Sequence, residues 1–182
     1  MSGLLLGMSV AAIVGLAALG LILRLRRRRA RQSERRSRPA ALQDAELLHV
    51  EKTFKTTRPV PIAAKVDRVY RLPSGLLVLV ELKTRWNGKP SISDVIHLSA
   101  QRLALSGSTG EPVASQGFVL IAWPGVRRSH FAHRVDLLST DQVVTLVERR
   151  AAILSGRASP RYAVHAGDCR QCAFRLECDG AA

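Results

Sequence analysis

The sequence predicts an α/β domain with a small mixed β-sheet flanked by helices and preceded by one transmembrane helix. Three observations lead to this prediction. Two runs rich in Val, Leu and aromatic residues are joined by a short turn, which is typical of a β-hairpin. Two segments with helical spacing of apolar residues alternate with two further strand-like runs, which indicates a sheet covered by helices. A long uncharged stretch lies near the start of the chain.

The uncharged stretch is the predicted membrane span. Gly3–Leu23 holds 21 residues without a charge, and at about 1.5 Å per residue a helix of this length spans about 30 Å, the thickness of a bilayer core. A cleaved signal peptide would need basic residues before the apolar run, but here they follow it. Because arginines mark the cytoplasmic end of a span, we expect a single-pass protein with a cytoplasmic C-terminal domain, at a prokaryotic inner membrane.

Charge is unevenly distributed along the chain. The formal net charge is +14, and the run from Arg24 to Arg38, with nine arginines and Glu34 as its one acidic residue, supplies +8 of it. The remaining +6 permits contact with nucleic-acid phosphates without requiring it. The arginine run itself suits anionic lipid headgroups better than nucleic acid. We therefore expect an anchor over residues 1–23, a basic juxtamembrane linker over 24–42 and the folded domain over 43–182.

The first half of the domain is predicted to be mainly extended. Gln43–Phe54 has the pattern of a helical turn followed by an extended piece. Ile62–Leu72 and Leu76–Trp86 are predicted strands, and the Pro73–Gly75 loop between them suits a type I turn closed by a left-handed glycine.

The second half is predicted to contain two helices and two strands. Ser91–Gly107 has helical spacing, with a serine available as N-cap and Gly107 as the expected stop. Gly117–Trp123 is a continuous apolar run typical of a buried strand, and His130–Leu138 is a further predicted strand. Ser139–Gly156 is a predicted helix with a capping-box pattern at its start and a closing glycine.

A chemically suggestive group lies on the hairpin. In the predicted register, opposed residues have numbers that sum to 148, so that Asp67 faces Glu81 with Cβ atoms about 5 Å apart. Two carboxylates at that separation favour a hard divalent cation, Mg²⁺ or Mn²⁺. Lys83 shares the face of Glu81, while Leu82 points to the other face and leaves its carbonyl available. This arrangement suits metal-assisted phosphodiester hydrolysis, in which Lys83 serves the attacking water. The alternative is an ordinary exposed Glu–Lys pair at a strand end.

The segment KVDRVYRLPSGLLVLVELKTR resembles the core of the PD-(D/E)XK nuclease superfamily, in its branch of RecB-type and CRISPR-associated four-cysteine nucleases. The resemblance implies a restriction-endonuclease-like core and metal-dependent DNA cleavage. Gln101 matches the glutamine of a Q-x-x-x-Y motif that orients the lysine or the substrate, although Leu105 replaces the tyrosine. His49 is the candidate for an upstream histidine that helps to bind the metal in this branch.

All three cysteines lie in the C-terminal segment CRQCAFRLEC, at Cys169, Cys172 and Cys178. Their clustering indicates metal or cluster ligation in a cytoplasmic domain, where structural disulfides are rare. The resemblance implies a [4Fe–4S] cluster, whose fourth ligand would be a residue other than cysteine. Alternatively, His165 completes a Cys₃His zinc site, or the segment binds nothing firmly.

Three functions agree with these patterns. The leading hypothesis is a membrane-anchored, Mg²⁺- or Mn²⁺-dependent deoxyribonuclease with a cysteine-bound staple. The alternatives are a nucleic-acid-binding module without catalysis on a nuclease fold, and a membrane-anchored scaffold for protein partners.

Overall fold

A computed structural model describes residues 18–26, 28–29, 32–125 and 130–161 of the chain. By its internal contacts the chain divides into two compact units, Met1–Ser139 and Thr140–Ala182. The sheet, the helix that covers it and the candidate site all belong to the first unit.

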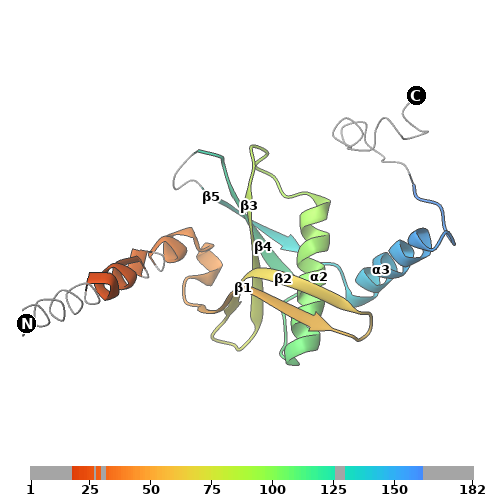
Figure 1. Cartoon of the computed structure of the whole chain (residues 1–182), viewed down its shortest axis with the longest axis horizontal. Coiled ribbons are helices and arrows are strands. Elements are labelled where there is room, and N and C mark those ends of the chain that lie inside the picture. The colour runs from red at the N-terminus through yellow and green to blue at the C-terminus, as the bar shows by residue number, and fades with distance from the viewer. Residues whose placement is uncertain (1–17, 27, 30–31, 126–129, 162–182) are drawn as a thin grey trace, which may run out of the picture. The chain divides into compact units, whose positions relative to one another are not determined.

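The first unit is built on one five-stranded sheet (Figure 1). Its strands, which lie side by side in chain order, are β1 (Glu46–Thr56), β2 (Ile62–Arg71), β3 (Leu77–Thr84), β4 (Gln116–Ala122) and β5 (His130–Asp136). All neighbouring pairs are antiparallel except β3 and β4, which are parallel. Parallel neighbours need a crossover connection, and α2 (Ile92–Thr109) provides it.

The hairpin of β2 and β3 has the register that the sequence predicts. Arg68 pairs with Val80 and Arg71 pairs with Leu77, so that the numbers of opposed residues sum to 148. Gly75 adopts a left-handed φ of 86°, and its N–H donates to the Leu72 carbonyl across the turn. A left-handed third residue in the loop is the feature that brings the strands into this register.

Helix α2 begins as the sequence predicts but ends later. The Asp94 carboxylate accepts a hydrogen bond of 2.8 Å from the Ser91 backbone N–H, as in a capping box. Gly107, the predicted stop, lies inside the helix, which ends at Gly110 with a left-handed φ of 71°. Gly107 serves packing instead, because a Cβ added there would lie 2.7 Å from the Thr56 Cβ at the end of β1.

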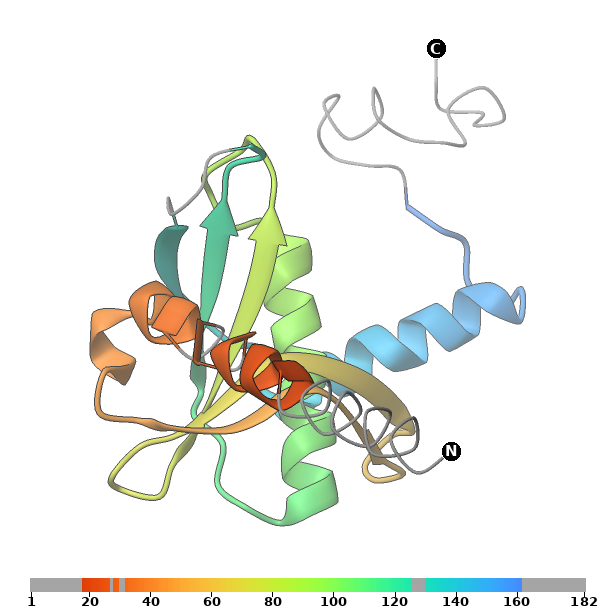
Figure 2. The same cartoon turned by 60° about the vertical axis from the view of Figure 1, so that its left-hand side comes forward.

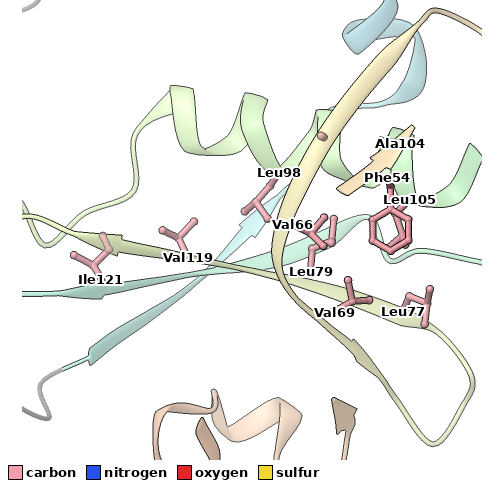
Figure 3. Packing of buried hydrophobic residues seen from close by; sticks show 11 residues of the cluster. Phe54, Val66, Val69, Leu77, Leu79, Leu98, Ala104, Leu105, Val119 and Ile121 are labelled. Carbon is pink, nitrogen blue, oxygen red and sulfur yellow. The ribbon is translucent and has the colours of Figure 1, made fainter. Parts of the chain in front are cut away.

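Two apolar clusters form the core, one on each face of the sheet. Figure 3 shows the cluster between the sheet and α2, in which Leu98 of the helix meets strand residues such as Leu79 and Val119. The cluster on the other face gathers around Tyr70 and includes Leu42, from the segment that precedes β1. In Figure 2, α2 lies behind β3 and β4, and the orange segment that precedes β1 lies in front of them.

The segment expected to be a polar linker is therefore packed against the sheet. It contains helical residues up to 37 and a short 3₁₀ helix, η1 (Ala40–Leu42). The Tyr70 hydroxyl donates a 2.6 Å hydrogen bond to Glu34, which also forms a two-pronged ion pair with Arg38. The Arg38 guanidinium lies 5.1 Å from the centre of the Tyr70 ring. Burial, together with the hydrogen bond to Glu34, raises the pKa of Tyr70 to about 12.

The second unit begins with α3 (Thr140–Leu154), close to the predicted helix. The turn after α3 contains Gly156 with a left-handed φ of 72°, as expected of a closing glycine. Residues 162–182 lie outside the described part of the chain.

The predicted transmembrane helix is corrected by the structure. Among the residues that are described, no helix combines the length and the apolar character needed to cross a bilayer. Residues 3–17 of the predicted span lie outside the described part.

Candidate active site

Asp67 and Glu81 lie on adjacent strands, and Glu81 lies on the sheet face that α2 covers. Leu77 and Leu79 belong to the cluster beneath α2, and because side chains alternate along a strand, Glu81 continues their row. On β2, Val66 and Val69 both belong to this cluster, so the strand does not alternate regularly at Asp67, which lies between them. Glu81 is 2% exposed, and Asp67 is half-buried. The Leu82 N–H donates a 2.7 Å hydrogen bond to Asp67 Oδ2, which ties the two strands together just beyond the last ladder pair.

Two side chains donate hydrogen bonds to the Glu81 carboxylate, and a third lies in contact with it. Lys83 Nζ lies 2.6 Å from Oε1, and Gln101 Nε2 lies 2.8 Å from Oε2. His97 Nδ1 is 3.1 Å from Oε1. His97 and Gln101 are one turn apart on α2 and therefore reach the same carboxylate from one face of the helix. Glu81 is thus held in place by its own strand on one side and by α2 on the other.

Gln101 joins three elements at the centre of the site. Its side chain is fully buried, and its amide nitrogen also donates to the Lys65 carbonyl of β2 at 3.0 Å. Its Oε1 has no hydrogen-bond partner in the described part of the chain. The glutamine predicted to orient Lys83 or the substrate therefore orients Glu81, and it leaves one buried acceptor available to a donor or cation.

The environment of Asp67 disfavours its charged form. Burial is the main cause that raises the pKa of this carboxyl, and the nearby charges of Glu81 and Glu51 raise it further. The hydrogen bond from Leu82 and the charge of Lys83 act in the opposite direction but do not outweigh them. Within the described residues, the ion pairs of the site involve Glu81 and Glu51 and leave Asp67 without one.

Glu51 is a site residue that the sequence did not reveal. Its neighbours Val50 and Lys52 pair with Arg68 and Val66, which places Glu51 opposite Asp67 in the β1–β2 ladder. Glu51 has a left-handed φ of 50°, which is uncommon for a residue with a side chain. It also forms an ion pair with Lys65. The alternation of polar residues along β1 was a weak signal for this position.

His49 does not join the carboxylates. The β1–β2 register shifts by one residue between Leu47 and His49, and His49 pairs with Val69 instead of standing opposite Asp67. Its ring lies against Phe54, with centroids 5.2 Å apart. Burial, assisted by the charge of Lys52, lowers the pKa of His49.

The predictions of metal-binding and iron–sulfur groups are corrected accordingly. In the part of the chain that the structure describes, no three His, Cys, Asp or Glu side chains gather as a metal site would require. Among these residues, His49, Asp67 and Glu81 are not gathered into one group of ligands. The predicted cluster or zinc ligands, His165 and Cys169, Cys172 and Cys178, lie outside the described residues.

The remaining predicted site residues lie close to Glu81. Lys83 is partly exposed, with 29% of its side chain accessible. The Leu82 side chain packs against the cluster on the far face, as predicted, and its N–H, not its carbonyl, makes the contact to Asp67. Leu105 of α2, at the place of the expected tyrosine, is fully buried in the cluster between the helix and the sheet. His97 contacts the carboxylate at the centre of the site.

Comparisons with known proteins leave the family open. No family model matches the chain, and a comparison with curated proteins gives no match. Among solved structures, the chain is similar to one titled "Crystal structure of SSO0001", with 22% sequence identity and a TM-score of 0.49. The match covers 91% of this chain and 71% of the other. A likeness of this size assigns neither a family nor an activity.

Proposed function

We propose that this chain is a nuclease that hydrolyses phosphodiester bonds in DNA at Asp67, Glu81 and Lys83. The observation that carries the proposal is the electrostatic state of Asp67. Among the described residues this half-buried carboxyl has no ion-pair partner and lies beside a buried carboxylate, and burial, together with repulsion from Glu81, raises its pKa. Clustered ionisable groups with perturbed pKa values are typical of functional sites. The resemblance of the hairpin to PD-(D/E)XK nucleases supports the same chemistry.

The pair of carboxylates suits one divalent cation of the Mg²⁺ type. Mg²⁺ usually takes one or two protein carboxylates and completes its shell with water and substrate phosphate, so a set of three protein ligands is not needed. Asp67 fits such an ion because it forms no ion pair among the described residues, and the charge of Lys83 does not outweigh its burial. When bound, a divalent cation of this kind polarises the phosphoryl oxygen and acidifies a bound water.

The protein's own groups have separable roles in this proposal. Lys83, at the exposed end of the Glu81 row, is placed to hold the attacking water and to stabilise the negative charge that develops on the phosphate. Gln101 fixes the rotamer of Glu81 from beneath. His97 shares Oε1 of Glu81 with Lys83, so it keeps that carboxylate paired when Lys83 turns toward a substrate.

The test is a nuclease assay on the purified full chain with Mg²⁺ or Mn²⁺ and with single-stranded and duplex DNA. Lys83→Met keeps the length of the side chain and removes its charge, and we expect cleavage to fall about 100-fold or more. Lys55→Met is the matched control, because this exposed lysine lies on β1 away from the carboxylates and its loss should leave the rate unchanged. Equal rates for wild type and Lys83→Met, or no cleavage by wild type with either metal, would contradict the proposal.

One observation favours a second candidate, a nucleic-acid-binding module without catalysis. Both oxygens of Glu81 already accept hydrogen bonds, Oε1 from Lys83 and Oε2 from Gln101, and His97 Nδ1 lies 3.1 Å from Oε1. A carboxylate satisfied in this way has less need of a metal. DNA binding that is independent of Mg²⁺ and is not followed by cleavage would identify this function.

A further inference from the structure

Two aromatic side chains lie exposed near the candidate active site without a role in it. Trp123 follows β4 directly and is 38% exposed, and Phe131, near the start of β5, is 41% exposed. Their rings contact each other, with centroids 5.2 Å apart and planes inclined by 45°. Large aromatic side chains usually bury this area in a core or in an interface, so an exposed pair next to an active site indicates a binding surface.

The register of the sheet places this pair on the same face as Lys83. Lys83 pairs with Ile121 across the parallel ladder, and Ile121 pairs with Phe131 across the antiparallel one. Paired residues share a face, and Ile121 belongs to the cluster beneath α2. Trp123 is two residues beyond Ile121 and continues its row. Neighbouring strands are about 4.8 Å apart, so Phe131 lies about 10 Å from Lys83 along the sheet, measured between backbones.

The surroundings of Trp123 are built by the loop that follows β3. The Arg85 N–H donates a 3.0 Å hydrogen bond to the Ala122 carbonyl, which carries the β3–β4 pairing up to the position before Trp123. The Arg85 guanidinium is held by Asp94 of α2 at 2.6 Å. A Cβ added at Gly88 would lie 3.7 Å from Trp123 Nε1, so the loop backbone stands close to the indole edge. One edge of the indole therefore lies against this loop.

We propose that Trp123 and Phe131 stack on an unpaired nucleobase of the strand whose phosphate is held at Lys83. The inference rests on the proposed function, to which it adds a base-binding subsite and a preference for unpaired DNA. Charge favours this occupant, because Lys83 is partly exposed on the face of the aromatic pair and the exposed Lys89 follows Gly88, which lies near Trp123, and lysines suit a phosphate backbone. Stacking on aromatic rings is tolerant of base identity, so the subsite selects unpaired structure and not sequence.

Intrinsic fluorescence gives a direct test, because the chain contains two tryptophans. In the full chain with Trp86→Phe, Trp123 is the one remaining indole. We titrate this protein, in EDTA to prevent cleavage, with a short single-stranded oligonucleotide, its duplex, and an abasic strand of equal length. The expected result is quenching by the single strand, and little quenching by the duplex or the abasic strand. Equal quenching and affinity for the abasic strand would overturn the proposal, since phosphates alone would then account for binding.

Substitutions test the same point without fluorescence. Trp123→Leu should weaken binding of the single strand about tenfold and leave binding of the abasic strand unchanged. Trp123→Phe, which keeps an aromatic face, should bind nearly as well as the wild type and guards against a folding artefact. Val50→Ala is the matched control, because it removes another exposed apolar side chain from β1, at the other edge of the sheet. Unchanged binding by Trp123→Leu would overturn the proposal.

The outcomes separate this subsite from the proposed activity. If Lys83→Met abolishes cleavage while Trp123→Leu has no effect on binding, the nuclease stands and the stacking site does not. If the single strand quenches Trp123 selectively but no metal supports cleavage, the stacking site stands and the nuclease does not. Concentration-dependent self-association that shields Trp123 from an added quencher would assign the patch to a second copy of the chain and overturn the proposal.

Discussion

At the scale of single residues, the central feature of the site is Asp67, a carboxyl group whose surroundings disfavour its charged form. Asp67 keeps one hydrogen bond, from Leu82, while burial and two neighbouring carboxylates raise its pKa. Glu81 is the opposite case, because two hydrogen-bond donors and His97 surround it. The unfavourable burial of the Asp67 charge beside the well-paired Glu81 lowers stability. Such a residue is expected where it serves function and not stability.

Asp67→Asn should therefore stabilise the fold while it removes activity. The amide keeps an oxygen for the Leu82 N–H but carries no charge to bury or to repel Glu81. The folded pKa of Asp67 lies above the ordinary value of 3.8, so the folded state of the wild type loses stability as pH rises through this window. Thermal melts should give Asp67→Asn a higher melting temperature than wild type at pH 7. The difference in melting temperature should disappear below the ordinary pKa of Asp67.

Cleavage by Asp67→Asn should fall about 100-fold or more if Asp67 takes part in catalysis. Asp44→Asn, at an exposed position before β1, serves as the control for the loss of one negative charge. A melting temperature for Asp67→Asn that is below that of wild type at pH 7 would show that the charge is stabilising in the fold, contrary to this account.

At the scale of elements, α2 determines how the site is closed. The helix crosses from β3 to β4, contributes His97 and Gln101 to Glu81, and covers the apolar row that leads to the carboxylates. Its far half is brought close to β1 by Gly107, where a side chain would meet Thr56. The glycine that looks like a helix stop in the sequence is thus a point of close approach between α2 and β1.

Gly107→Ala should destabilise the domain by about 1–3 kcal/mol, because the added methyl overpacks the contact with Thr56. In an open helix the same change would stabilise by about 1 kcal/mol. Urea unfolding measures the loss of stability for Gly107→Ala alone and for Gly107→Ala combined with the second change, Thr56→Gly. We expect the second change to cost less in the Gly107→Ala background than in wild type. Ser108→Ala at the adjacent exposed helix position is the control, and stabilisation by Gly107→Ala would refute the contact.

At the scale of the whole molecule, both faces of the sheet are covered. Helix α2 covers one, and the segment before β1 covers the other through Leu42 and the network of Glu34, Arg38 and Tyr70. A stretch that is basic and polar by composition therefore belongs to the fold of the first unit. Next to the sheet, Arg38 of this segment contacts the Tyr70 ring and forms an ion pair with Glu34.

Leu42→Ala tests whether this segment is part of the core. The side chain is 1% exposed, and its truncation should cost about 2–5 kcal/mol of unfolding free energy if the cluster around Tyr70 is packed as described. Gln43→Ala, at the exposed neighbouring position, should change stability little. Chemical unfolding of the full chain distinguishes the two variants, and equal stabilities would mean that the segment is a linker after all.

Local rules account for most of the elements. The turn glycine at position 75 and the alternation of apolar residues determine the β2–β3 register, and with it the neighbourhood of Asp67, Glu81 and Lys83. Helix spacing and caps determine α2 and α3. These signals involve residues a few positions apart, which is why sequence alone resolves them.

Only the tertiary structure decided what the long-range contacts bring together. The register of β1 against β2 puts Glu51 opposite Asp67 and pairs His49 with Val69. The α2 crossover turns His97 toward Glu81, and the order of β3, β4 and β5 aligns Phe131 with Lys83. The sequence by itself determined the strands, helices and central carboxylates, because periodicity and turn chemistry are local. Their other neighbours depended on register shifts and crossings between distant segments, which no local pattern encodes.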